Sequence, residues 1–364
     1  MPVLQSQIAN LKSQISTSGP EDARTRIHEI ARLFAAKPFR PHPLLKSGHA
    51  QTVAGYGWPR RFNLRAHRMD EARLFRVEPD VSMLAHCRWQ PDRQQHPTII
   101  LLHGLEGSSI SVYVLSTAHK AYQAGFNVLR LNMRNCGGTE HLTPTLYNSG
   151  MTSDLEAVIH ELTEQDGLRR ILLAGYSMGG QLILKLAGER GAEMPESVVG
   201  LCAISPSIDL RACADQIARR SNWVYQRRFL RSLQRRMRHK QQLYPDVYDI
   251  SDLHRVRSIR DFDNRYTARH GGYRDADDYY ARASALQFVQ HIERPTLIIH
   301  AQDDPFVPFS SFLCSSIAEN SHILFLAPPH GGHVGFVARA AKGEDRFWAE
   351  NRIVEFCRFA SESA

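Results

Sequence analysis

The sequence predicts an α/β fold in which a mostly parallel, eight-stranded sheet is covered by helices on both faces. From about residue 73 onward, short apolar runs alternate with longer segments of helical periodicity. Runs such as TIILLH, RRILLAG and PTLIIHA are largely β-branched and apolar, which is typical of strands buried on both faces. With 364 residues and 43% hydrophobic content, the chain can bury the large core that such a fold requires.

The strands and helices are expected in a regular order along the chain. Alternation of strand and helix favours parallel pairing, because each helix returns the chain to the same edge of the sheet. The predicted strands span residues 73–78, 82–89, 98–103, 127–133, 170–175, 198–205, 295–301 and 322–327. The predicted helices span residues 111–124, 151–165, 178–190 and 347–360.

Residues 1–43 are expected to form a helical extension before the sheet. A 4-3-4 spacing of apolar residues is consistent with a short amphipathic helix carrying Leu4, Ile8, Leu11 and Ile15. A second helix is predicted to begin at Ser18 and to end before Pro38. Its apolar face comprises Ile27, Ile30, Leu33 and Phe34. We expect this helix to pack on the core, with membrane contact and oligomerisation as the alternatives.

Composition argues against several classes of protein. No apolar stretch reaches the roughly 18 to 20 residues of a membrane-spanning helix. The first residues lack the basic and apolar regions of a signal peptide. Six cysteines are scattered without a C-x-x-C pair, which disfavours a disulfide framework and a zinc site. We therefore expect a soluble, reduced, cytoplasmic protein that needs no metal or other cofactor.

A basic segment interrupts the alternation of strands and helices. Residues 206–290 are predicted as a helical insert that separates the core into residues 44–205 and 291–364, and that lies over the carboxyl edge of the sheet. Between Arg211 and Arg260 there are thirteen Lys and Arg residues against four Asp residues. The whole chain has a net charge of +8, so the rest of it is nearly neutral. Nucleic-acid binding is not expected, because no reading motif accompanies the charge.

One helix of this insert is expected to be amphipathic. Apolar residues at helical spacing are Trp223, Leu230, Leu233 and Met237, with Phe229 adjacent. The other faces are expected to carry Arg227, Arg228, Arg231, Arg235, Arg236 and Arg238. Such a helix suits a lid whose apolar face covers a binding site, and whose basic side contacts an anionic lipid surface through Arg227–Lys240. The alternative is a solvated charged face on a packing helix.

The motif Gly175-Tyr176-Ser177-Met178-Gly179-Gly180 is the sharpest chemical signal. It follows the apolar run RRILLA and precedes the amphipathic segment QLILKLAGER. In a G-x-S-x-G turn between strand and helix, the glycines allow close approach and the serine is presented on a strained backbone. The following helix N-terminus favours negative charge near the serine. Ser177 is therefore the predicted nucleophile.

A serine nucleophile needs a base that is held by a third group. Asp303 and Asp304 follow the strand at 295–301, and His330 and His333 follow the last strand. We predict Asp304, which opens a D-x-x-V-P run, and His333, which follows two glycines. Asp303 is then expected to cap the turn or bond a backbone amide, and His330 to lie at the rim. A metal site made of these four residues is disfavoured, because their spacing matches no ligand motif.

The developing oxyanion requires two preorganised donors. One is expected to be the backbone N–H of Met178, directly after the nucleophile. The other is expected from the loop after the strand at 98–103, where the N–H of Leu105 follows His103 and Gly104. For His103 itself we expect a structural role, with its ring bonded to the loop backbone.

Several segments together resemble the YheT-like branch of the α/β-hydrolase superfamily. They are LLKSGHAQTV (44–53), HGLEGSSISVY (103–113), NMRNCGGTEHLTPTLYNSGMTSDL (132–155), GYSMGGQLILK (175–185), FDNRYTARHGGYRDADDYY (262–280), AQDDPFVP (301–308) and HGGHVGF (330–336). The resemblance implies the α/β-hydrolase fold and a triad of Ser177, an Asp of the 303–304 pair and His333. It also implies carboxylic-ester substrates, since relatives include medium-chain fatty-acid esterases, ethyl-ester synthases and phospholipases.

The expected function is therefore hydrolysis of short- to medium-chain carboxylic esters through an acyl-enzyme. The same site would also serve an acyltransferase that passes the acyl group to an alcohol. A third alternative, of a different class, is a non-catalytic binding protein on a hydrolase fold, because a fold does not establish an activity.

Overall fold

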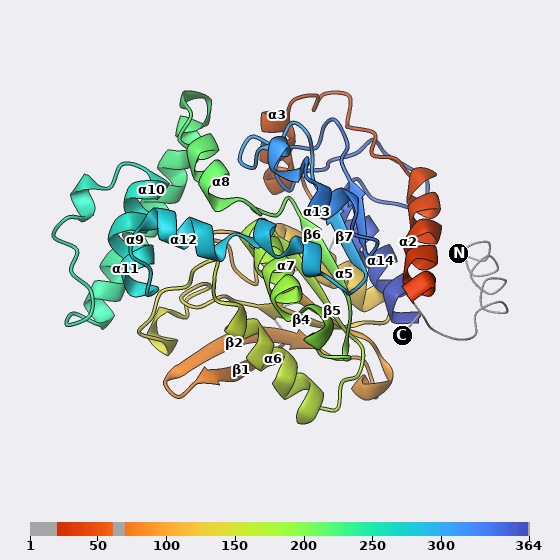
Figure 1. Ribbon diagram of the computed structural model, residues 1–364, viewed down its shortest axis with the longest axis horizontal. Coiled ribbons are helices and arrows are strands. Elements are labelled where there is room, and N and C mark those ends of the chain that lie inside the picture. Colours follow the sequence, from red (N-terminus) through yellow and green to blue (C-terminus); the bar gives the residue numbers. More distant parts are fainter. Residues whose placement is uncertain (1–19, 61–69, 363–364) are drawn as a thin grey trace.

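The centre of the molecule is an eight-stranded sheet in the order β1-β2-β4-β3-β5-β6-β7-β8 (Figure 1). The computed structural model describes residues 20–60 and 70–362. β1 (Glu71–Glu78) and β2 (Val81–Arg88) are antiparallel to their neighbours. The parallel strands are β3 (Thr98–Leu102), β4 (Asn127–Leu131), β5 (Ile171–Tyr176), β6 (Val198–Ile204), β7 (Thr296–Ile299) and β8 (Ile323–Leu326). The predicted mostly parallel sheet is confirmed, and each strand overlaps its predicted range.

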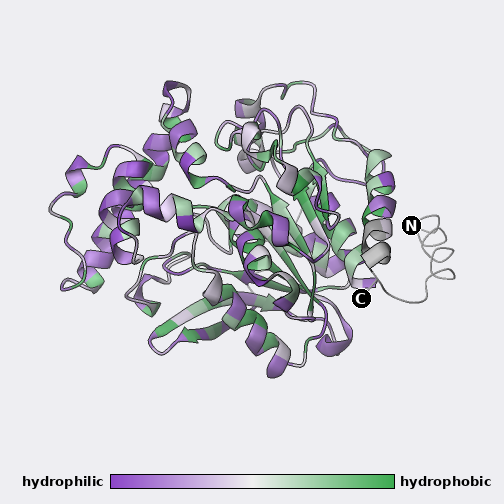
Figure 2. Ribbon diagram, in the orientation of Figure 1, coloured by the Kyte–Doolittle hydropathy of each residue, from purple (hydrophilic) through white to green (hydrophobic). Residues whose placement is uncertain are grey.

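Both faces of the sheet are covered, which explains the continuous apolar runs. In β3, Ile99 and Leu101 face one helix layer, whereas Ile100 and Leu102 face the other. The first layer contains α5 (Val112–Gln123) and α14 (Trp348–Glu362). The second contains α6 (Thr152–Glu164) and α7 (Met178–Arg190). Figure 2 shows the resulting apolar centre.

The helix α2 (Pro20–Ala35) packs on the same layer as α14. Its buried residues are Ile27, Ile30 and Phe34, as predicted. Leu33 was predicted on the same face and is 49% exposed, because the contact with the core involves a narrower stripe of the helix. The predicted helix with Leu4 to Ile15 lies outside the described residues.

Most of the predicted insert, residues 206–290, lies as a helical layer at the carboxyl ends of the strands (Figure 1). Its last turns, Ala285–Gln287 and Val289–His291, pack along α7 instead. The insert contains α8 (Leu210–Ile217), α9 (Trp223–Leu243), α10 (Ile259–Phe262), a π-helical turn (Asp263–Thr267), α11 (Ala268–His270) and α12 (Ala276–Ala283). Its two ends meet, because the N–H of Leu286 donates to the carbonyl oxygen of Ile208 (3.0 Å) and the N–H of Leu210 donates to Oγ of Ser284 (3.1 Å). The chain therefore enters and leaves the insert through one narrow neck, while α9 makes further contacts with the core.

The amphipathic helix of the insert differs from the prediction at its ends and in its basic residues. Leu230, Leu233 and Met237 are buried as expected. Trp223 is 59% exposed, because it is the first residue of α9 and reaches beyond the buried stripe. Arg236, expected on a solvated face, is buried, and Lys240 is buried as well. Their charges are satisfied by the Glu106 carboxylate and by the carbonyl oxygens of residues 140 and 143, respectively.

Among the helices in residues 20–60 and 70–362, none is both long and apolar enough to cross a bilayer.

Candidate active site

Ser177 lies on a tight turn between β5 and α7. Its backbone has φ of +53° and ψ of −116°, a strained conformation for a residue with a side chain. A Cβ at Gly175 would lie 2.4 Å from the carbonyl carbon of Gly179. A Cβ at Gly179 would lie 2.6 Å from the carbonyl oxygen of His103. The glycines of the motif are therefore required for the contact of strand, helix and neighbouring turn that presents Ser177.

The two aspartates and two histidines form two separate pairs. Nδ1 of His333 lies 2.9 Å from Oδ2 of Asp304, and Nδ1 of His330 lies 3.2 Å from Oδ2 of Asp303. Asp303 also accepts the N–H of Gly332 (2.9 Å), the backbone role expected for it. The side chain of His330 is 46% exposed. Only His333 of the two histidines lines the cavity with Ser177.

The Asp304 carboxylate is buried and still favours its ionised form. Burial by itself would raise the pKa of Asp304, but the charge of His333 and its hydrogen bond outweigh burial and lower this pKa. Oδ1 also accepts the N–H groups of Phe306 (2.8 Å) and Val307 (3.0 Å). An ionised carboxylate at this position can accept a hydrogen bond from Nδ1–H and so keep Nε2 of His333 available as a base.

The loop that carries His333 is supported by α3 (Gly48–Gly57), whose first residues belong to the upstream LLKSGHAQTV segment, residues 44–53. The N–H of His333 donates to Oγ1 of Thr52 (2.8 Å), whose hydroxyl donates to the carbonyl oxygen of Gly48 (2.7 Å). A Cβ at Gly332 would lie 2.2 Å from that same oxygen. The role of this segment is not evident from the sequence, but these contacts indicate that it positions the histidine loop.

The turn after β3 lies directly beside Ser177. A Cβ at Gly104 would be 3.1 Å from Cβ of Ser177. The N–H groups of Gly104 and Glu106 both donate to tyrosine hydroxyls. Within residues 20–60 and 70–362, the N–H groups of Leu105 and Met178 have no hydrogen-bond partner, and both residues line the cavity. Two donors are thus available near Ser177 at the predicted positions.

His103 has the structural role expected for it. Its Nδ1 contacts the carbonyl oxygen of Gly104 (2.8 Å), and its Nε2 accepts the N–H of Met133 (3.1 Å). Burial lowers the pKa of His103 to about 4, so the ring is neutral near pH 7. A neutral ring bonded on both sides fixes the turn and has no free nitrogen for proton transfer.

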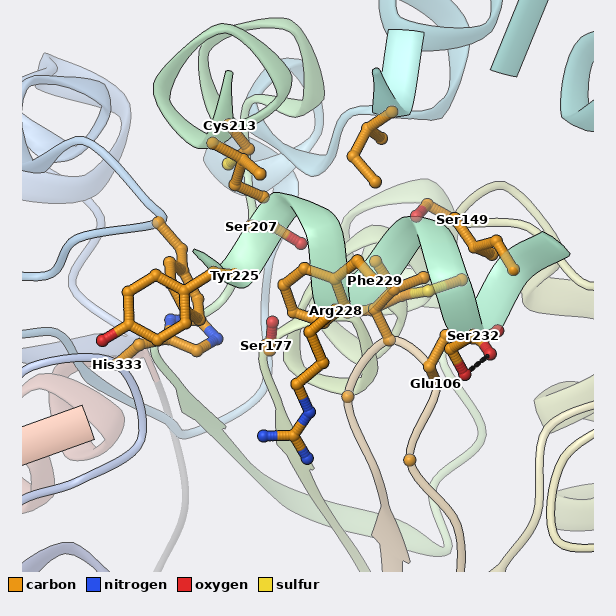
Figure 3. Close-up of a pocket in the computed structure, with 18 of the residues that line it drawn as sticks. Glu106, Ser149, Ser177, Ser207, Cys213, Tyr225, Arg228, Phe229, Ser232 and His333 are labelled. Carbon is orange, nitrogen blue, oxygen red and sulfur yellow. Dashed lines mark hydrogen bonds between the residues drawn. The ribbon is translucent and has the colours of Figure 1, made fainter. Parts of the chain in front are cut away.

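A cavity of about 570 Å³ opens in front of Ser177 and His333 (Figure 3). The insert contributes much of its wall, since Tyr225, Arg228 and Phe229 of α9 lie beside the two residues. Apolar side chains around the cavity are Leu146, Leu210, Cys213, Ile217, Leu233, Ile259 and Phe262. Polar groups in the wall include Ser149, Ser207, Asp263 and Thr267. The cavity is therefore suited to a largely apolar ligand with a few polar groups.

Phe306 is a site residue that the sequence analysis missed. Its ring packs on the imidazole of His333 at 4.6 Å and on the ring of Tyr225 at 4.7 Å, measured between centroids. Tyr225 in turn lies within 3.3 Å of Nδ1 of His49. Phe306 thus connects the histidine to the insert. Its position two residues after Asp304 was the available signal, but its partners are distant in sequence.

The buried Asp263 in the cavity wall predicts a pH-dependent stability. Burial raises the pKa of Asp263 from 3.8 to about 6, although its carboxylate accepts the hydroxyl of Tyr280 (2.7 Å). The folded state therefore binds more protons than the unfolded state between these values, and stability increases as pH falls. From pH 7 to pH 5 we expect a gain of roughly 1 kcal/mol in the free energy of unfolding from this group.

Urea unfolding at pH 7 and pH 5 measures this effect, with Asp263→Asn as the matched variant. The Asp263→Asn variant should lack the gain in the free energy of unfolding that Asp263 gives between pH 7 and pH 5. All other titrating groups should affect the two proteins equally. An identical pH response in the two proteins would contradict the assignment.

Comparison with known proteins is consistent with this geometry. A protein-family profile described as alpha/beta hydrolase fold matches residues 97–340. The chain is 33% identical to the putative esterase YheT of Escherichia coli, over 73% of this chain and 78% of that protein. It is 32% identical to phospholipase ABHD3 of Mus musculus, over 68% of this chain and only 60% of that longer protein. A solved esterase, Pf2001 of Pyrococcus furiosus, has the same fold with a TM-score of 0.52 and 16% identity, over 83% of this chain and 96% of that one.

The profile covers most of the chain, and the match to YheT spans more than two thirds of both sequences. The chain belongs to the α/β-hydrolase family, in the branch that contains YheT.

Proposed function

We propose that this protein is a serine hydrolase that cleaves short- to medium-chain carboxylic esters through an acyl-enzyme. The observation that supports this most directly is the 2.9 Å contact between Asp304 and His333, in the cavity that Ser177 lines. The names of two relatives, an esterase and a phospholipase, agree with ester substrates. The apolar wall of the cavity suits an acyl chain.

In the proposed mechanism, His333 accepts the hydroxyl proton as Oγ of Ser177 attacks the acyl carbonyl carbon. Asp304 holds the Nδ1 proton and stabilises the imidazolium that forms. The N–H groups of Leu105 and Met178 donate to the oxyanion. His333 then protonates the leaving alcohol, and water releases the acid from Ser177 by the same steps in reverse.

Fluorophosphonate labelling tests this proposal without knowledge of the natural substrate. We expect one label per chain on Ser177, located by peptide mass mapping, and none on the Ser177→Ala variant. A panel of p-nitrophenyl esters from two to sixteen acyl carbons then defines the chain-length preference. Folded wild-type protein without label would contradict the proposal and favour a binding protein. Diversion of product from free acid to a new ester by added alcohol would favour an acyltransferase.

We further propose that the insert is a lid whose outer rim contacts an anionic lipid surface. Exposed apolar side chains at the rim of the cavity belong to Val53, Tyr56 and Ile110, and α9 begins with exposed Trp223 and Val224. Exposed basic side chains on α9 are Arg227, Arg228, Arg231, Arg235 and Arg238. Apolar and basic groups around one cavity suit a surface of anionic lipids better than a nucleic acid. The six free cysteines, five of them buried, support a reducing cytoplasm as the location.

Co-sedimentation with vesicles checks the lipid contact. The variant Arg227→Gln/Arg231→Gln should bind vesicles of phosphatidylserine and phosphatidylcholine roughly 10- to 30-fold more weakly, since each basic residue near an anionic surface contributes about 1 kcal/mol. The matched control is Arg274→Gln/Arg282→Gln, which neutralises two exposed arginines outside α9. Equal losses in both variants, or none in either, would argue against a rim-specific contact.

A further inference from the structure

The turn that carries Leu105 has a charged residue where glycine is expected. Residues 104–107 form a β-turn, in which the N–H of Gly107 donates to the carbonyl oxygen of Gly104 (3.0 Å). Glu106 occupies the third position with φ of +57°. In a type II turn this left-handed position normally belongs to glycine. The backbone of Glu106 must therefore be stabilised by contacts of its side chain.

Those contacts lie beneath α9 and are buried. Oε1 of Glu106 accepts hydrogen bonds from the hydroxyl of Tyr147 (2.8 Å) and from Nε of Arg236 (2.9 Å). Its Oε2 accepts the hydroxyl of Ser232 (Figure 3). The N–H of Glu106 donates to the same tyrosine hydroxyl (3.1 Å). The side chains of Glu106 and Arg236 are only 6% and 8% exposed, so this ion pair is largely removed from water.

Ser232 and Arg236 both belong to the insert, so the shape of the turn depends on α9. Arg236 also lies over the ring of Tyr147, with its guanidinium carbon 5.2 Å from the centroid. Burial by itself would raise the pKa of Glu106, but Arg236 and the hydroxyl donors outweigh burial and lower it. An ionised carboxylate that lost its cation at this buried position would be strongly disfavoured.

We propose that the Arg236–Glu106 ion pair is a positioning contact, through which the insert holds the turn in the shape that aims the Leu105 N–H at the oxyanion. This inference rests on the proposed function, since it takes that N–H as an oxyanion donor. Arg236 also lines the cavity, but in this proposal it acts through Glu106 and is therefore a positioning residue. A donor to the oxyanion contributes mainly in the transition state, so its misalignment lowers kcat and leaves KM nearly unchanged.

Steady-state kinetics on a p-nitrophenyl ester test the proposal with three variants of the full chain. Arg236→Gln should lower kcat by roughly 10- to 100-fold and change KM by less than about threefold. Arg236→Lys keeps the charge and should restore most of kcat. Arg255→Gln removes an exposed charge from another part of the insert and should behave as wild type. Wild-type kcat in Arg236→Gln, or a loss that lies wholly in KM, would overturn the proposal.

A double variant keeps the test decisive if Arg236→Gln destabilises the fold. Glu106→Gln/Arg236→Gln removes both charges of the buried pair and preserves side chains of similar size. Glu140, which also lies 3.7 Å from Arg236, is partly exposed to water. It should still take one fluorophosphonate label per chain on Ser177, with kcat reduced about as much as in Arg236→Gln. Wild-type kcat in the double variant would overturn the positioning role alone, whereas an unlabelled wild-type protein would overturn the proposed function itself.

Discussion

Asp304→Asn is expected to lower kcat for ester hydrolysis by roughly 10³- to 10⁴-fold. The carboxylate lies 2.9 Å from Nδ1 of His333 and fixes the proton on that nitrogen. An amide can donate to Nδ1 and so favours the tautomer in which Nε2 is protonated and cannot act as a base. The loss should appear in kcat and in the rate of fluorophosphonate labelling, while the fold is retained because the two side chains have the same size.

Asp303→Asn is the matched control for this variant. Asp303 contacts His330 and the N–H of Gly332, and an asparagine oxygen can still accept that N–H. We expect less than about a threefold change in kcat. A larger loss in Asp303→Asn than in Asp304→Asn would mean that the other Asp–His pair serves Ser177, and it would reverse the assignment of the acid and the base.

Gly179→Ala is expected to destabilise the protein by at least about 3 kcal/mol. The new Cβ would lie 2.6 Å from the carbonyl oxygen of His103 and 2.7 Å from that of Leu102. Both oxygens belong to the backbone at the end of a central strand, so neither can move without disturbing the sheet. We expect a fall of roughly 5 to 10 °C in Tm, measured by calorimetry, together with loss of esterase activity.

Gly57→Ala serves as the control for an added methyl group. A Cβ at Gly57, the last residue of α3, would meet no heavy atom within 4 Å. Its effect should be within about 0.5 kcal/mol, as for other surface substitutions. A Gly179→Ala protein as stable as this control would show that the strand and the following helix can separate at low energetic cost.

The sheet was predictable from sequence because each central strand is buried on both faces. Residues 98–102, for example, are all buried and form one continuous run, without polar residues at alternate positions. Such a run indicates a buried strand from the local sequence alone. The turn that carries Ser177 was equally local, since the glycines and the serine are adjacent in the chain. The proximity of Asp304 and His333 followed from their positions after two strands, because the ends of parallel strands meet at one edge of the sheet.

The features that sequence did not predict depend on contacts between distant segments. Periodicity placed Arg236 on a solvated face, because a helical pattern carries no sign of a buried carboxylate that lies 130 residues earlier. The packing of Phe306 on His333 and the bond from His333 to Thr52 likewise join separate parts of the chain. Leu33 and Trp223 are apolar and fall at helical spacing, but both lie beyond the edge of the core, so their side chains remain exposed.

The narrow neck of the insert, closed between Ile208 and Leu286, has a consequence for how the insert can vary. A segment whose two ends leave the core side by side can change in length at little entropic cost, since closure entropy rises only slowly with length. Inserts of different size can therefore reshape the cavity wall while the strand ends that carry Ser177, Asp304 and His333 stay in place. Chimeras that graft a foreign insert onto this neck have one further requirement, because the graft must bring a cation to Glu106.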